Sequence, residues 1–130
     1  KSDFIMASVH RFPGEKGNII KKKSKLEPVQ ALKIEYELSM AAIENPKTLI
    51  LGHPFGMSLK RFNAVPEKKK FIDIIKKCKL YNKVFEVNAN YHPDINFLID
   101  ECLKENTLIS LGSNAHNIRD VGKILNLIQL

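Results

Sequence analysis

The chain has 130 residues, of which 44% are hydrophobic and 27% are charged, and its formal net charge is +7. These values are typical of a soluble globular protein with one domain and a hydrophobic core. No apolar run approaches the roughly 20 residues that a membrane helix needs, so we expect no membrane partner.

Two strand–helix units are predicted in the first part of the chain. The first strand covers residues 3–9, and a helix covers residues 27–45. The apolar face of this helix is predicted to carry Leu32, Tyr36, Ser39, Met40 and Ile43. The second strand covers residues 48–52, a loop covers residues 53–65, and a helix covers residues 66–81.

Two further units follow in the second part of the chain. The third strand covers residues 84–88 and its helix residues 93–105, and the fourth strand covers residues 108–112. A last helix is predicted from Asn117, which can cap it. Its apolar stripe is predicted to contain Ile118, Val121, Leu125 and Ile128.

Alternating strands and helices indicate an α/β fold, because parallel neighbours need a crossover about as long as a helix. The second and fourth strands are nearly all apolar, as expected when both faces of a sheet are covered. Four consecutive βα units fit either half of an eight-fold barrel or a small open α/β sheet.

Polar side chains follow the predicted strands where each one ends. His10 and His53 follow the first two strands, and Asn114 and His116 follow the fourth. A single histidine after a strand is more often a hydrogen-bonded loop residue. Ligands collect at the carboxyl ends of parallel strands, however, and neutral imidazole is the commonest metal ligand. We therefore predict a shared metal site, with Ser8, Asn88 and Ser113 as partners that orient the ligands.

Several catalytic classes lack their motifs. The sequence contains no GxxxxGK[ST] loop, no GxGxxG loop and no GxSxG elbow. Cys78 and Cys102 fall in the middle of predicted helices, which are poor places for a nucleophile, and they form no CxxC motif. We expect free thiols, a reducing cytoplasm and no zinc site at these cysteines. Metal-assisted hydrolysis of a phosphoester is the chemical class that remains.

The excess of basic residues is uneven along the chain. Lysine runs lie at residues 21–25, 68–70 and 76–77. Such runs attract polyanions or phosphorylated substrates, although solvated helix and loop faces are the more common explanation. A nucleic-acid partner stays open, but the aromatic residues are not interleaved with basic ones as RNA-binding sheets require.

The order of five short motifs resembles the second half of the PHP (polymerase and histidinol phosphatase) superfamily. The motifs are "SVH", "LGHP", "FEVN", "LGSNAH" and "DVG", and the resemblance extends from about His10 to Leu130. It implies that the four βα units form part of a distorted (β/α)7 PHP-type barrel. It also implies two or three divalent metal ions, such as zinc, manganese or iron, in a TIM-barrel-like hydrolase.

The resemblance assigns roles to individual residues. It implies that His10 and His53 hold one ion and that His116 holds another. Asn114 stands where the family usually carries an aspartate ligand, and Asn88 matches a structural position. Apart from the resemblance, we expect Lys21, Lys22 and Lys23 of the basic loop to draw in the phosphate. The family's opening HxH motif and its bridging glutamate are not in this chain.

The sequence therefore predicts that residues 1–130 form a partial PHP-like metal-dependent phosphoesterase domain without the N-terminal half of the barrel. The substrate would be a phosphomonoester or a nucleotide, and this chain alone would be inactive. Because the chain begins at Lys1, we expect a fragment or a processed product that packs against its missing half or a second copy. The alternative is a degenerate, non-catalytic PHP module with a structural or protein-interaction role.

Overall fold

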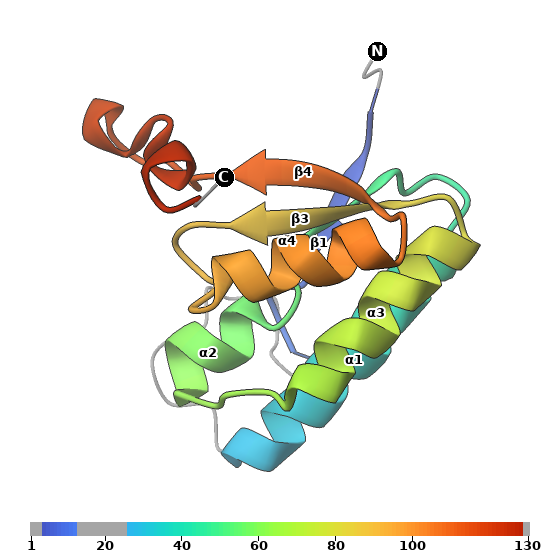
Figure 1. Ribbon diagram of the computed structural model, residues 1–130. Coiled ribbons are helices and arrows are strands. Elements are labelled where there is room, and N and C mark those ends of the chain that lie inside the picture. Colours follow the sequence, from blue (N-terminus) through green and yellow to red (C-terminus); the bar gives the residue numbers. More distant parts are fainter. Residues whose placement is uncertain (1–3, 13–25, 129–130) are drawn as a thin grey trace.

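A computed structural model describes residues 4–12 and 26–128 of the chain (Figure 1). The elements are, in order, β1 (Met6–Ser8), α1 (Pro28–Glu44), β2 (Ile50–Gly52), α2 (Gly56–Phe62), α3 (Lys68–Leu80), β3 (Val84–Asn88), α4 (Ile95–Lys104) and β4 (Leu108–Gly112). Two short 3-10 helices follow, η1 (Ile118–Asp120) and η2 (Lys123–Asn126). The predicted alternation of strands and helices is confirmed, and β3 and β4 have the predicted bounds.

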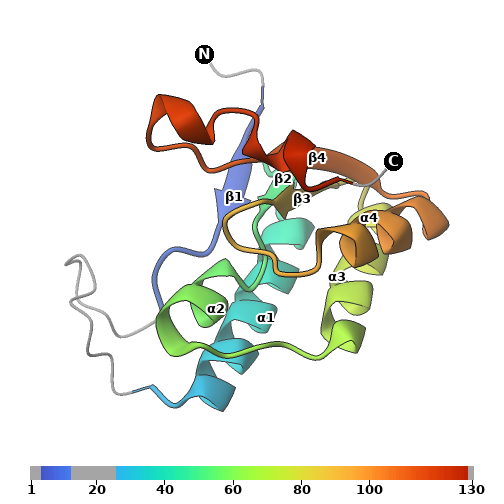
Figure 2. The ribbon, with the colours of Figure 1, turned by 60° about the vertical axis from the view of Figure 1, so that its left-hand side comes forward.

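The four strands form one parallel sheet in the order β1-β2-β3-β4. Ser8 pairs with Gly52, and Asn88 pairs with Gly112, so the carboxyl ends of neighbouring strands lie side by side. Right-handed crossovers that always step in the same direction place their helices on the same face. Figure 2 shows α1, α3 and α4 together on one side of the sheet.

The core lies between this face and the three helices. Alternate strand residues point toward the helices and are buried, as Leu51, Phe85 and Val87 are. The helices contribute Ile43, Ile74, Ile75, Cys78, Leu98 and Cys102 to the same core. Burial raises the pKa of both cysteine thiols to about 12, so the two free thiols are neutral and unreactive core groups.

The segment between β2 and α3 differs from the prediction, because it contains the helix α2 instead of a loop throughout. Phe55 precedes α2 in a left-handed conformation with a φ of 64°, and α2 has 7 residues. The backbone amides of two buried residues in its first turn, Met57 and Ser58, donate to the carboxylate of Glu35 on α1. A distant residue therefore stabilises this helix, and local periodicity could not predict it.

The predicted last helix is also wrong. Gly122 adopts a left-handed conformation with a φ of 75° and divides the segment into η1 and η2. Ile118 is 88% exposed, Val121 is 70% exposed and Leu125 is 66% exposed, so these three residues of the predicted stripe are not buried, whereas Ile128 is partly buried and packs against the core. Ile124 is the core residue of this segment. Asn117 does cap η1, because its side-chain oxygen accepts from the Arg119 amide.

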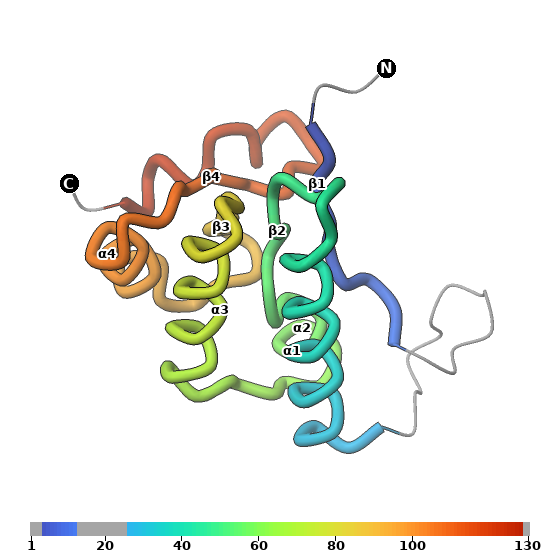
Figure 3. The backbone as a smooth tube through the Cα atoms, turned by 90° about the vertical axis from the view of Figure 1, so that its right-hand side faces the viewer, coloured from blue at the N-terminus to red at the C-terminus, as the bar shows by residue number. Residues whose placement is uncertain are grey.

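The backbone trace in Figure 3 shows the chain passing from the end of β4 toward β1 before it turns back. Among the described residues, no helix is both long enough and apolar enough to cross a membrane.

Candidate metal centre

Two histidines meet at the carboxyl edge of the sheet. His10 follows β1 by two residues and His53 directly follows β2, and these strands are paired neighbours. The Nε2 atoms of His10 and His53 are 3.1 Å apart. Two imidazoles bound to one ion at about 2.0–2.1 Å have nitrogen atoms about 2.8–3.4 Å apart for ligand angles between octahedral and tetrahedral values. The distance therefore fits either a shared cation or a hydrogen bond between the rings.

The surroundings of His53 favour the neutral ring that a metal ligand needs. Burial lowers the pKa of His53, and the nearby His10 lowers it further, whereas Glu86 opposes the shift. One feature departs from an ordinary metal site. The Nδ1 atom of His53 is buried and has no hydrogen-bond partner among the described residues, although ligating histidines normally donate from their second nitrogen.

The backbone of His53 is held by a buried carboxylate. Glu86 on β3 accepts the His53 amide hydrogen at 2.7 Å through Oε2, and its Oε1 accepts from Asn88 Nδ2 at 3.0 Å. A Cβ atom at Gly112 would lie 2.0 Å from Glu86 Oε1. Glycine at this position on β4 therefore leaves the space that the carboxylate occupies. His53 itself has a φ of 29°, a strained value that this hydrogen bond helps to hold.

An aromatic residue connects His53 to Asn114. The Tyr91 ring stacks on the His53 ring with a centroid separation of 4.3 Å. Asn114 Nδ2 donates to the Tyr91 hydroxyl at 3.1 Å. The ammonium of Lys60, from α2, lies 5.7 Å from the centroid of the same Tyr91 ring. Tyr91 and Lys60 are thus parts of this site that the sequence did not reveal.

The structure brings only some of the predicted metal ligands together. His10 and His53 are in contact, Asn114 reaches them through Tyr91, and His116 is exposed to solvent. Within residues 4–12 and 26–128, no group of three or more His, Cys, Asp or Glu side chains could hold a metal ion. Lys21, Lys22 and Lys23 lie outside the described residues.

None of the three predicted orienting residues has a hydrogen bond to His10 or His53 in the described structure, and two of them have other partners. Asn88 donates to Glu86 and accepts from the Asn90 amide. Ser113 accepts the Ile124 amide through Oγ at 3.3 Å, which anchors η2. Ser8 lies opposite Gly52, and a Cβ atom added at Gly52 would lie 2.0 Å from the Ser8 hydroxyl. Asn88 therefore supports His53 indirectly, through the Glu86 carboxylate.

The fourth histidine, His92, connects two loops of this edge. Its Nδ1 accepts the Asn88 amide hydrogen at 3.0 Å, so Nε2 carries the proton and donates to the Pro54 carbonyl at 3.1 Å. Burial lowers the pKa of His92 to about 4. Because both ring nitrogens are occupied, His92 serves as a structural residue that fixes the loops carrying His53 and Tyr91.

No protein-family model matches the chain, and neither the curated proteins nor the solved structures that were compared with it include a match. The fold and the site define the chain as a parallel α/β protein with a paired-histidine site at the carboxyl edge of its sheet.

Proposed function

We propose that the chain is part of a PHP-type, metal-dependent phosphoesterase domain and that His10 and His53 hold a divalent ion. The single observation that carries this proposal is the Nε2–Nε2 distance of 3.1 Å between two histidines on adjacent strand ends. The winding of the sheet also supports it. A (β/α)7 barrel has consecutive parallel strands with helices on one face, which is the arrangement of the four strands and of α1, α3 and α4.

The residues around the paired histidines would have different roles in such a site. The Nε2 atoms of His10 and His53 face each other, and Glu86 fixes the backbone that carries His53. Tyr91 covers one face of the His53 ring and limits its rotation. Lys60 is placed to attract an anionic phosphoester toward the edge. A bound divalent ion supplies Lewis acidity for the attack of water on phosphorus.

Zinc titration of the purified chain tests the paired histidines. We expect His10→Ala and His53→Ala each to weaken zinc affinity by about tenfold or more, because each removes one of the two close nitrogen ligands. The measurement is competition against a chromophoric chelator, with circular dichroism to confirm that each variant is folded.

His116→Ala is the matched control, because His116 is an exposed histidine at the same edge of the sheet. We expect it to leave the affinity of the pair unchanged. Equal zinc affinity in the unsubstituted chain and in both the His10 and the His53 variants would contradict the proposal.

A second candidate function is a degenerate PHP module that has lost catalysis. The observation that favours it concerns Asn114, which the resemblance places at an aspartate position. The Asn114 amide donates to the Tyr91 hydroxyl, and a neutral amide lacks the charge that offsets the desolvation of a divalent ion.

Asn114→Asp distinguishes the two candidates. If the site is a metal centre, we expect the new carboxylate to raise zinc affinity about tenfold or to add a second bound ion, because carboxylates are ionic ligands. Equilibrium dialysis with elemental analysis measures both the affinity and the number of bound ions. Asn114→Ala is the control, since it removes the amide donor to Tyr91, as Asn114→Asp does, but adds no charge. Unchanged zinc binding in Asn114→Asp would favour the degenerate module.

A further inference from the structure

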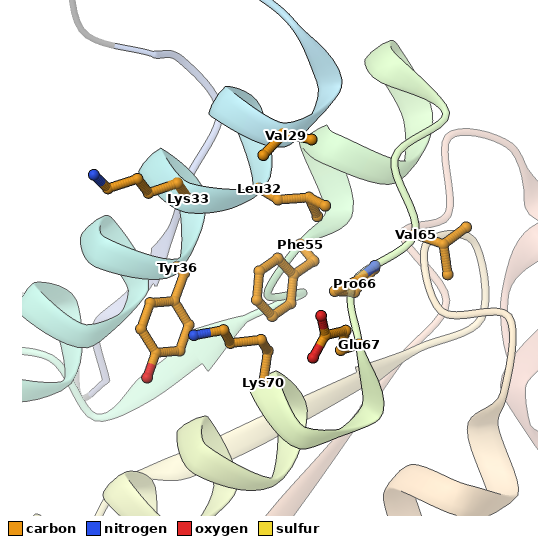
Figure 4. Close-up of a pocket in the computed structure, with 9 residues that line it drawn as sticks. All are labelled: Val29, Leu32, Lys33, Tyr36, Phe55, Val65, Pro66, Glu67 and Lys70. Atoms are coloured by element: carbon orange, nitrogen blue, oxygen red, sulfur yellow. The ribbon is translucent and has the colours of Figure 1, made fainter.

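A pocket on the helical side of the molecule combines apolar walls with charged side chains. It lies between α1 and the N-terminal end of α3, has a volume of about 320 Å³, and includes none of the histidines in its lining (Figure 4). Its apolar walls are formed by Val29, Leu32, Phe55, Val65 and Pro66. This volume is within the roughly 300–1,000 Å³ that small-molecule sites occupy.

One cation is held at the edge of this pocket. The ammonium of Lys70 lies 4.3 Å from the centroid of the Tyr36 ring, in a cation–π contact. Within residues 4–12 and 26–128, Lys70 forms no ion pair with a carboxylate. Figure 4 shows the Lys70 side chain extending beside Phe55 toward Tyr36. A positioned cation beside an apolar wall can bind an anion that also has an apolar body.

The other two charged residues of the lining differ from Lys70. Lys33 is 4.0 Å from Glu37, and in Figure 4 its ammonium points away from Phe55. Glu67 places its carboxylate on the Pro66 side of Phe55, away from the Lys70 ammonium, in the same view. Because this carboxylate repels additional negative charge, it disfavours dianions such as a phosphomonoester more than it disfavours a single carboxylate.

We propose that this pocket binds a small organic monoanion, namely a carboxylate with an aromatic or short aliphatic body. The apolar body would lie against Leu32 and Phe55, and the carboxylate would face Lys70. The net charge of the chain, +7, adds a favourable long-range field for an anion. Such a site would be separate from the paired histidines and from phosphoester chemistry.

Nuclear magnetic resonance of the full chain labelled with 15N tests the proposal, with 3-phenylpropionate and its neutral isostere 3-phenylpropanamide as probes. We expect the acid to shift the amide signals of Leu32, Phe55 and Lys70, and to bind at least tenfold more tightly than the amide. Lys70→Gln should remove this preference. Glu67→Gln should tighten the acid severalfold, because it removes the opposing carboxylate.

Lys79→Gln is the matched control, since Lys79 is an exposed lysine in the last turn of the same helix and outside the pocket. It should leave the affinity for the acid unchanged. Equal affinity for the acid and the amide would overturn the proposal. Shifts confined to other surfaces, an unchanged preference in Lys70→Gln, or no shifts up to the solubility limit would overturn it as well.

Discussion

Glu35→Ala is expected to lower the free energy of unfolding by about 4 kcal/mol, because it leaves several buried donors without a partner. Glu35 lies on α1 with 0% of its surface exposed. Its carboxylate accepts from the Met57 amide at 3.1 Å, from the Ser58 amide at 2.7 Å and from the Ser58 hydroxyl at 2.6 Å. These donors belong to the first turn of α2, which the loss of Glu35 would leave uncapped.

The same contacts act on the pKa of the Glu35 carboxyl. Burial raises the pKa of its carboxyl, and the hydrogen bonds from Ser58 and Met57 oppose that increase. Chemical denaturation followed by circular dichroism measures the effect of the substitution. Glu37→Ala is the control, because Glu37 lies two residues further along the same helix in an exposed position. We expect that variant to change the free energy of unfolding by less than about 0.5 kcal/mol.

The fold was predictable where a local pattern and burial agree. β3 and β4 are short, mostly apolar segments with turn residues on both sides. Their bounds in the structure are those that the sequence predicts. The buried row of α1 was not fully predictable. It consists of Ala31, Glu35, Ser39 and Ile43, which share one helix face but include two polar side chains. Hydrophobic periodicity alone therefore predicts that the neighbouring apolar row is the buried face of α1.

The meeting of His10 and His53 was predictable for a topological reason. Each follows a strand, and consecutive parallel strands bring their carboxyl ends together. The same reasoning does not extend to His116. After β4, Asn114 has a φ of 44°, and the chain turns so that the His116 side chain is exposed. A backbone reversal of this kind depends on tertiary contacts, and motif spacing does not encode it.

The residues that support the His53 loop could not be predicted, because each lies far along the chain from the group that it contacts. Glu86 reaches the His53 amide across 33 residues of sequence, and His92 reaches the Pro54 carbonyl across 38 residues. The local signal was the placement of Glu86 between the apolar residues Phe85 and Val87 of β3. A carboxylate in such a strand must find buried donors, which makes it a candidate for organising a site.

Acid should destabilise the protein through His92. Burial lowers its folded-state pKa to about 4, whereas the unfolded value is about 6.5. Between these two values the unfolded chain binds more protons than the folded chain, so stability falls as the pH decreases from 6.5 to 4. The contribution of His92 is fully present above pH 6.5, and its loss across the window is about 3 kcal/mol. The lowered pKa of His53 acts in the same direction.

Denaturant unfolding at a series of pH values checks this expectation. His92→Gln removes the titrating ring while retaining a side chain that can both accept and donate, so we expect a shallower fall in stability below pH 6.5 than in the unsubstituted chain. His116→Gln removes a histidine from an exposed position and should preserve the original slope. An unchanged slope in His92→Gln would show that other groups control acid unfolding, and that the contact between His92 Nδ1 and the Asn88 amide tolerates a charged ring.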